Sequence, residues 1–182
     1  YMDRPSFAKT RMAKEFVKFN ERCFAMLLGD MRSYNYVVDV TPDFDMEQYR
    51  VRPIDFDQLT YEGRKNHYLP QFYKENFEVI QFCMDILSPE TVDQYQTEER
   101  TLIRKRYFLS QGQIEELLES MSKVPLSKPE KILSLCEDLN DFHRCEDFTG
   151  LDSMGQVLQL HLTKMIERTE HRTYLGRTSF KA

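Results

Sequence analysis

Apolar residues recur every three or four positions over residues 7–28, which is the spacing of one face of an α-helix. The repeat consists of Met12, Phe16, Phe19, Cys23 and Met26. Lys14, Lys18 and Glu21 fall between its members. The pattern predicts a helix with one apolar stripe and one solvent-facing side, ended by Gly29.

The period changes after this helix. Residues 34–41 and 49–56 are rich in β-branched and aromatic side chains, and the second stretch alternates apolar and polar positions. Pro42 and Asp43 begin a polar turn between them. We therefore expect a β-hairpin, and Pro53 predicts that its second strand lies at a sheet edge.

Residues 58–69 have the composition of a loop, and only helical patterns follow it. The expected helices cover residues 70–87, 89–108, 111–123, 129–142 and 152–168. Ser88 with Pro89 supplies an N-cap, Ser110 with Gln113 a capping box, and Ser127 with Pro129 and Glu130 a second serine–proline start. The polar tail from residue 169 is expected to fray. The chain is thus predicted to be mainly α, a helix-dominated α+β fold with one hairpin.

Length and composition fit one globular domain over residues 1–182, with a helix and hairpin over 7–60 and a helical bundle over 70–168. A net charge of −5, with mixed signs along the chain, argues against a general nucleic-acid binder. The apolar stretches are too short to span a membrane, and no secretory signal is visible, so the cytoplasm is the expected location. The four cysteines show no C-x-x-C spacing, and Cys23 and Cys83 are expected to be buried thiols.

One group of polar residues points to a specific chemistry. Asp30 and Asn35 are five residues apart, and Asp55 follows after the predicted hairpin. An acid, an amide and a second acid arranged in this way can orient a hydroxyl nucleophile and hold Mg²⁺ on nucleotide phosphates. Arg32 is either a phosphate contact or a surface ion-pairing residue. Asp57 is either a second metal ligand or an exposed acid at a strand end.

The order of these motifs resembles the C-terminal lobe of the protein-kinase-like superfamily. The resemblance lies in Asp-x-Arg-x-x-Asn after a long helix, a hairpin, and then Ile-Asp-Phe at residues 54–56. It is nearest to the atypical members, such as lipid kinases and aminoglycoside phosphotransferases. It implies ATP-dependent phosphoryl transfer with Asp30 as the catalytic acid, Asn35 and Asp55 as Mg²⁺ and nucleotide ligands, and an unidentified hydroxyl acceptor.

The chain also departs from that family. Leu28 and Gly29 stand where the family usually has a histidine, and Asp57 stands where it often has glycine. No glycine-rich loop and no Val-Ala-x-Lys strand precede Asp30. We therefore expect that the chain is a fragment and that its nucleotide-binding lobe lies upstream of Tyr1. The alternative is a non-catalytic helical interaction domain, either a degenerate kinase lobe or an unrelated module.

Other polar residues have simpler interpretations. Arg64, Lys65 and His67 lie where the resemblance implies substrate recognition, although a solvated loop is the simpler interpretation. His143 and His161 have no partner at metal-ligand spacing and are expected to be structural or surface residues. Tyr68, Phe72, Tyr73 and Phe77 are expected in a helix core, and Glu98 and Glu99 on a charged helix face.

Overall fold

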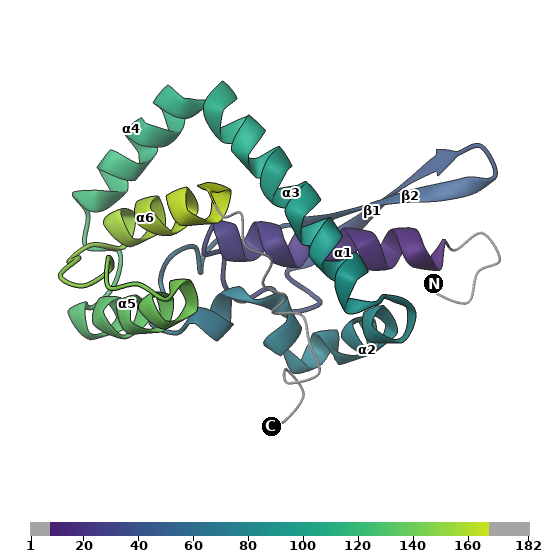
Figure 1. Cartoon of the computed structure of the whole chain (residues 1–182), viewed down its shortest axis with the longest axis horizontal. Coiled ribbons are helices and arrows are strands. Elements are labelled where there is room, and N and C mark those ends of the chain that lie inside the picture. Colours follow the sequence, from purple (N-terminus) through teal and green to yellow (C-terminus); the bar gives the residue numbers. More distant parts are fainter. Residues whose placement is uncertain (1–7, 168–182) are drawn as a thin grey trace.

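The structure, a computed structural model, describes residues 8–167. Over this range it is mainly helical with one two-stranded antiparallel sheet, which confirms the expected fold class. The elements are α1 (Lys9–Ala25), β1 (Tyr36–Asp43), β2 (Met46–Pro53), the 3₁₀ turns η1 (Lys65–Tyr68), η2 (Pro70–Phe72) and η3 (Lys74–Asn76), α2 (Phe77–Ile86), α3 (Pro89–Leu109), α4 (Gln111–Ser122), α5 (Pro129–His143) and α6 (Met154–Glu167). Figure 1 shows the hairpin projecting beside α1, and α3 and α4 meeting at an apex.

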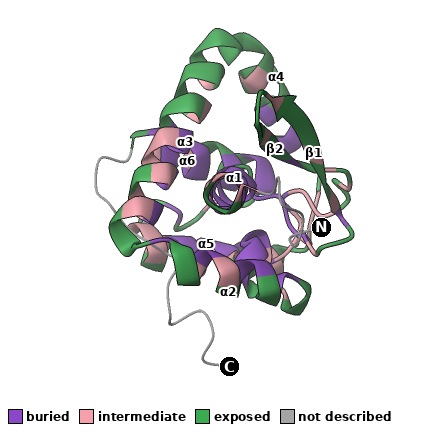
Figure 2. Cartoon of the chain, turned by 90° about the vertical axis from the view of Figure 1, so that its right-hand side faces the viewer, coloured by how far each residue is buried: buried purple, intermediate pink, exposed green. Residues whose placement is uncertain are grey.

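Helix α1 is the central element of the molecule. Figure 2 shows it end-on and buried, with helices on one side and the hairpin on the other. The prediction of a solvent-facing side is wrong, because α1 packs against β2, α2, α3 and α6. Even Glu15, Glu21 and Arg22 on this helix are buried.

Buried charges on α1 are paired with one another and with partners on other elements. Arg22 donates to Glu15 Oε1 at 2.6 Å and to the Val51 carbonyl at 3.0 Å, and lies 3.4 Å from Glu99 Oε1. Glu99 is 1% exposed, so its assignment to a charged surface is wrong. Glu98 does lie near the surface, where Lys14 and Lys18 bind it. These pairs connect α1 to both β2 and α3.

The hairpin forms where it was predicted, with a shorter turn, because β1 continues through Pro42 and Asp43 and β2 already begins at Met46. Val38 lies opposite Val51 and Val40 opposite Tyr49. Val51 and Tyr49 of β2 are buried on the side of α1, whereas Val38 and Val40 of β1 stay exposed. The turn is Phe44-Asp45, where Phe44 has a φ of 52°. Because the sheet has two strands, both are edge strands, as Pro53 indicated.

Two apolar clusters meet at α1. One cluster joins α1 to the hairpin, α2 and the start of α3, and includes Phe16, Val51 and Ile80. The other joins the end of α1 to α4, α5 and α6, and includes Phe24. The ring centroids of Phe24 and Phe142 lie 4.8 Å apart, in an edge-to-face geometry. The segment that follows α1 is therefore attached to a rigid centre.

The expected helix over residues 70–87 begins only at Phe77, because side chains hold the preceding residues in 3₁₀ turns. Asn20 accepts from the backbone N–H of Gln71 at 3.2 Å. The Asn76 amide donates to the carbonyls of Met31 and Pro70, both at 2.8 Å. Phe72 and Phe77 are 40% and 51% exposed, so their placement in a helix core is wrong.

The remaining helices occur where they were expected, although not all their caps do. Ser88 Oγ accepts from the Thr91 N–H at 3.3 Å, which confirms that cap. Ser110 makes no side-chain cap, and Ser127 Oγ instead donates to the Tyr61 carbonyl at 2.6 Å. The last helix runs to Glu167, which is the last described residue. The expectations for residue 168 and for the tail from residue 169 therefore lie outside the described residues.

Two further expectations concern cysteines and membranes. Cys23 and Cys83 are buried free thiols, as predicted. Between residues 8 and 167, no helix is both long and apolar enough to cross a membrane.

Candidate functional site

The end of α1 determines where Asp30 lies. The helix stops at Ala25, and Leu27 then adopts a left-handed φ of 48°. The Leu28 N–H closes the end by donating to the Cys23 carbonyl at 2.9 Å. Asp30 is also left-handed, with a φ of 56°, a conformation that aspartate tolerates better than most residues. The helix thus ends before Gly29, and the predicted stop at that glycine is wrong.

The chain that follows the hairpin returns to this loop. The Gly29 N–H donates to the Gln58 carbonyl at 3.1 Å, and the Thr60 N–H donates to the Leu27 carbonyl at 2.7 Å. At the other end, the Ile54 N–H donates to the Asn35 carbonyl at 3.0 Å. Residues 55–57 are therefore fixed on both sides to the loop that carries residues 29–35.

Three of the predicted site residues contact one another directly. The Asn35 amide nitrogen donates to the Asp30 carbonyl at 2.7 Å and to Asp30 Oδ2 at 3.2 Å. Arg32 Nε donates to Asp30 Oδ1 at 2.7 Å. Asn35 is 8% exposed, whereas the side chain of Asp30 is 29% exposed. The acid is therefore fixed by its neighbours and still reaches solvent.

Arg32 connects this group to a distant turn. Its Nη1 donates to Glu75 Oε1 at 3.0 Å, and its guanidinium carbon lies 5.4 Å from the centroid of the Tyr73 ring. The hydrogen bond to Asp30 raises the pKa of Arg32 above its already high ordinary value. Arg32 therefore provides a permanent positive charge beside the acid.

Asp55 and Asp57 are close to this group in the backbone but not in their side-chain contacts. Asp55 Oδ1 accepts from the backbone N–H of Asp57 at 3.0 Å, which forms a local turn. Within residues 8–167, no hydrogen bond or ion pair joins either carboxylate to Asp30 or Asn35. The same range contains no cluster of three or more His, Cys, Asp or Glu side chains suited to a metal. A metal here would need Asn35, Asp55 and oxygens from a bound ligand.

Tyr73 and His67, which lie outside the predicted acid–amide–acid group, hold the Asp30 loop from outside. The Tyr73 hydroxyl accepts from the Asp30 N–H at 3.0 Å and donates to the His67 carbonyl at 2.7 Å. The His67 ring lies against Gly29, where an added Cβ would be 2.5 Å from His67 Cδ2. Burial lowers the pKa of His67 and raises that of Tyr73 to about 12, so both are neutral at pH 7. A glycine next to an acid was the sole sequence signal for this close packing.

Comparison with known proteins provides no relative for this site. No family model, curated protein or solved structure matches the chain. The resemblance to the kinase-like superfamily consequently rests on the motif residues themselves.

The other candidate ligands form a separate, structural group. His143 Nε2 lies 3.0 Å from His161 Nδ1, and His161 Nε2 lies 2.9 Å from the Phe24 carbonyl. Because a carbonyl only accepts, His161 Nε2 carries a proton and fixes the end of α1. Cys145 contacts Asn140 at 3.8 Å. These contacts suit a structural role at the junction of α1, α5 and α6.

Proposed function

We propose that this chain is the C-terminal lobe of an ATP-dependent phosphotransferase of the protein-kinase-like kind. It would act with Mg²⁺ on a hydroxyl acceptor. The observation that carries the proposal is the pair of hydrogen bonds from the Asn35 amide to Asp30, together with the backbone bonds that hold residues 55–57 beside them.

The orientation of Asn35 supports a metal-binding role. Its Nδ2 is used by Asp30, so Oδ1 points to the other side of the amide and, among residues 8–167, accepts no hydrogen bond. A neutral amide oxygen and the Asp55 carboxylate are hard ligands that suit Mg²⁺, which commonly completes its shell with phosphate oxygens and water. When bound, Mg²⁺ would neutralise charge on the triphosphate.

Asp30 and Arg32 supply the remaining chemistry of the proposed transfer. Asp30 would accept the proton of the acceptor hydroxyl as its oxygen bonds to the γ-phosphorus. The bond from that phosphorus to the β–γ bridging oxygen then breaks, and ADP leaves with the electron pair. Arg32, already placed beside Asp30, would compensate the charge on the transferred group. Each carboxylate oxygen of Asp30 accepts one side-chain hydrogen bond and can accept a second, so the acceptor hydroxyl can donate to it while Arg32 and Asn35 stay in place.

The proposal includes an upstream lobe of the same protein. The contacts at Asp30, Asn35 and Asp55 concern the acceptor and the metal, and we assign the binding of the nucleotide base to residues before Tyr1. We also place the activity in the cytoplasm, where ATP is abundant.

The test is phosphoryl transfer and ADP formation by the longest natural form of the protein with Mg²⁺ and ATP. Asp30→Ala should reduce turnover by about a hundredfold or more, because it removes the proton acceptor. Asn35→Ala should raise the Mg²⁺ concentration needed for half-maximal turnover. Asp39→Asn is the matched control, because Asp39 pairs with Arg52 on the exposed hairpin face. Full activity in the Asp30 variant would refute the proposal.

A second candidate is a non-catalytic interaction domain. It is favoured by the exposed Phe108 and Leu109, which are 55% and 76% exposed at the junction of α3 and α4. This candidate predicts that Mg²⁺ and ATP leave the melting temperature of the longest natural form unchanged. The phosphotransferase predicts an increase.

A further inference from the structure

A pocket of about 440 Å³ lies between the 62–73 segment and the start of α5. Its walls include Glu62, Arg64, His67, Phe72, Tyr73 and Lys131. We propose that this pocket binds the acceptor of the phosphotransferase, and that the acceptor is an uncharged compound with several hydroxyl groups. The acceptor role rests on the proposed function, whereas the pocket and its ligand class rest on the contacts described below.

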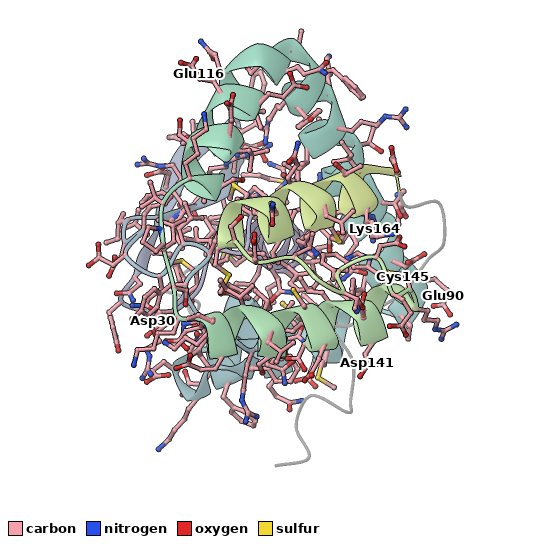
Figure 3. All side chains as sticks on the ribbon, turned by 90° about the vertical axis from the view of Figure 1, so that its left-hand side faces the viewer. Asp30, Glu90, Glu116, Asp141, Cys145 and Lys164 are labelled. Carbon is pink, nitrogen blue, oxygen red and sulfur yellow. The ribbon has the colours of Figure 1, made fainter. Side chains whose placement is uncertain are left out.

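The pocket and the Asp30 loop share a wall. Tyr73 lines the pocket, and its hydroxyl accepts from the Asp30 N–H at 3.0 Å. His67 also lines the pocket, while its ring packs against Gly29. In the view of Figure 3, Asp30 is labelled near one end of the α5 ribbon and Asp141 near the other. Asp30 itself does not line the pocket, so an acceptor held there must extend past Tyr73 for its hydroxyl to reach the Asp30 carboxylate.

The charges around the pocket cancel. Lys131 Nζ donates to Glu62 Oε1 at 2.8 Å and lies 4.1 Å from the centroid of the Tyr61 ring, so this ammonium already has partners. Arg64 and Glu130 are exposed and of opposite sign. His67 is neutral at pH 7 because burial lowers its pKa. The pocket thus has no excess charge to hold a phosphate, a nucleotide or a polyamine.

The remaining wall suits a ring that carries hydroxyl groups. Phe72 is 40% exposed, and its ring and that of Tyr73 provide apolar surface for C–H groups. The Ser134 hydroxyl, the Asn66 amide and the His67 ring supply hydrogen-bonding groups around them. An apolar wall with a few convergent polar groups is the usual form of a small-molecule site, and the volume lies within the usual range. A hexose or a cyclitol combines these two surfaces.

The test measures binding of small probe compounds to the full chain by calorimetry and by ligand-observed NMR, with no nucleotide present. The uncharged probes are glucose and myo-inositol, and the charged comparison probes are glucose 6-phosphate and spermidine. We expect saturable binding of at least one uncharged probe and weaker binding of both charged ones. Phe72→Ser and Ser134→Val should each weaken that binding by about tenfold. Phe108→Ser, which changes an exposed ring outside the pocket, should leave it unchanged.

Three results would overturn the inference. They are no binding of either uncharged probe, preferred binding of a charged probe, and equal binding by the wild-type chain and the Phe72 and Ser134 variants. Because the assay contains no ATP, its outcome is separate from that of the turnover assay. Polyol binding in a protein without phosphoryl transfer would support the pocket and its ligand class while refuting the phosphotransferase.

Discussion

The hydroxyl of Tyr73 accepts a hydrogen bond from the backbone N–H of Asp30 at 3.0 Å, across 43 residues of sequence. Asp30 is left-handed and belongs to no helix or strand, so its N–H has no regular backbone partner. The same hydroxyl donates to the His67 carbonyl at 2.7 Å. Tyr73 therefore satisfies two backbone groups and fixes the residue on which the proposed chemistry depends.

Replacing Tyr73 with phenylalanine should lower the free energy of unfolding by about 1–3 kcal/mol. The change leaves the ring in place but removes the hydroxyl, so the half-buried N–H of Asp30 loses its partner. Urea unfolding measures the effect. Tyr107→Phe is the control, because that hydroxyl makes no hydrogen bond within residues 8–167. Equal stability losses in the two variants would contradict the role of the Tyr73 hydroxyl.

Gly29→Ala should destabilise the fold by about 1–3 kcal/mol, because the new methyl group would overlap a neighbour. An added Cβ would lie 2.5 Å from His67 Cδ2 and 3.0 Å from the Gln58 carbonyl oxygen. Gly112→Ala provides a matched control in α4, where nothing lies within 4 Å of the added Cβ. This control should be neutral or slightly stabilising. Thermal unfolding of both variants checks the prediction, which an unchanged melting temperature for Gly29→Ala would disprove.

Local signals were sufficient for most of the secondary structure. Ser88 and Pro89 fix the start of α3, and the alternation around Tyr49 and Val51 fixes which face of β2 is buried. The spacing of Asp30 and Asn35 likewise predicted two side chains that do meet. In each case the deciding interaction lies within one element or one loop.

Predictions from the sequence were wrong where contacts with distant elements outweigh a local pattern. The polar side of α1 is buried because β2 and α3 supply partners for Arg22, which no local periodicity reveals. Residues 70–76 form 3₁₀ turns because Asn20 and Asn76 bind their backbone. Tyr73 reaches Asp30 for the same reason, through a turn whose position depends on the packing around it.

Arg22→Met should be strongly destabilising, by about 3–5 kcal/mol. It removes the charged partner of Glu15 and the nearer of the two arginines paired with Glu99, whose other partner, Arg106, lies 3.7 Å away. Both carboxylates are buried, so the loss of this charge is costly. Chemical unfolding at neutral pH measures the loss. Arg52→Met is the control, because Arg52 pairs with Asp39 on the surface, and such pairs contribute little. If the two variants lose similar stability, the buried pairs do not hold α1 to α3.

The pH dependence of stability should carry a contribution from His67. Burial lowers the pKa of its imidazole, although nearby Glu62 and Asp30 oppose the shift. Between this lowered value and the ordinary value of about 6.5, the unfolded chain binds more protons than the folded one. The free energy of unfolding should therefore rise with pH across that window and fall on acidification below about 6.5.

His67→Gln should make the dependence of stability on pH less steep in that window, because glutamine does not titrate. Denaturant unfolding of both chains at several pH values below and above about 6.5 gives the difference in slope. The comparison isolates His67, because the other three histidines are the same in both proteins. An identical slope in the two chains would mean that His67 has the same proton affinity folded and unfolded, and that its ring is not held in the desolvated position against Gly29.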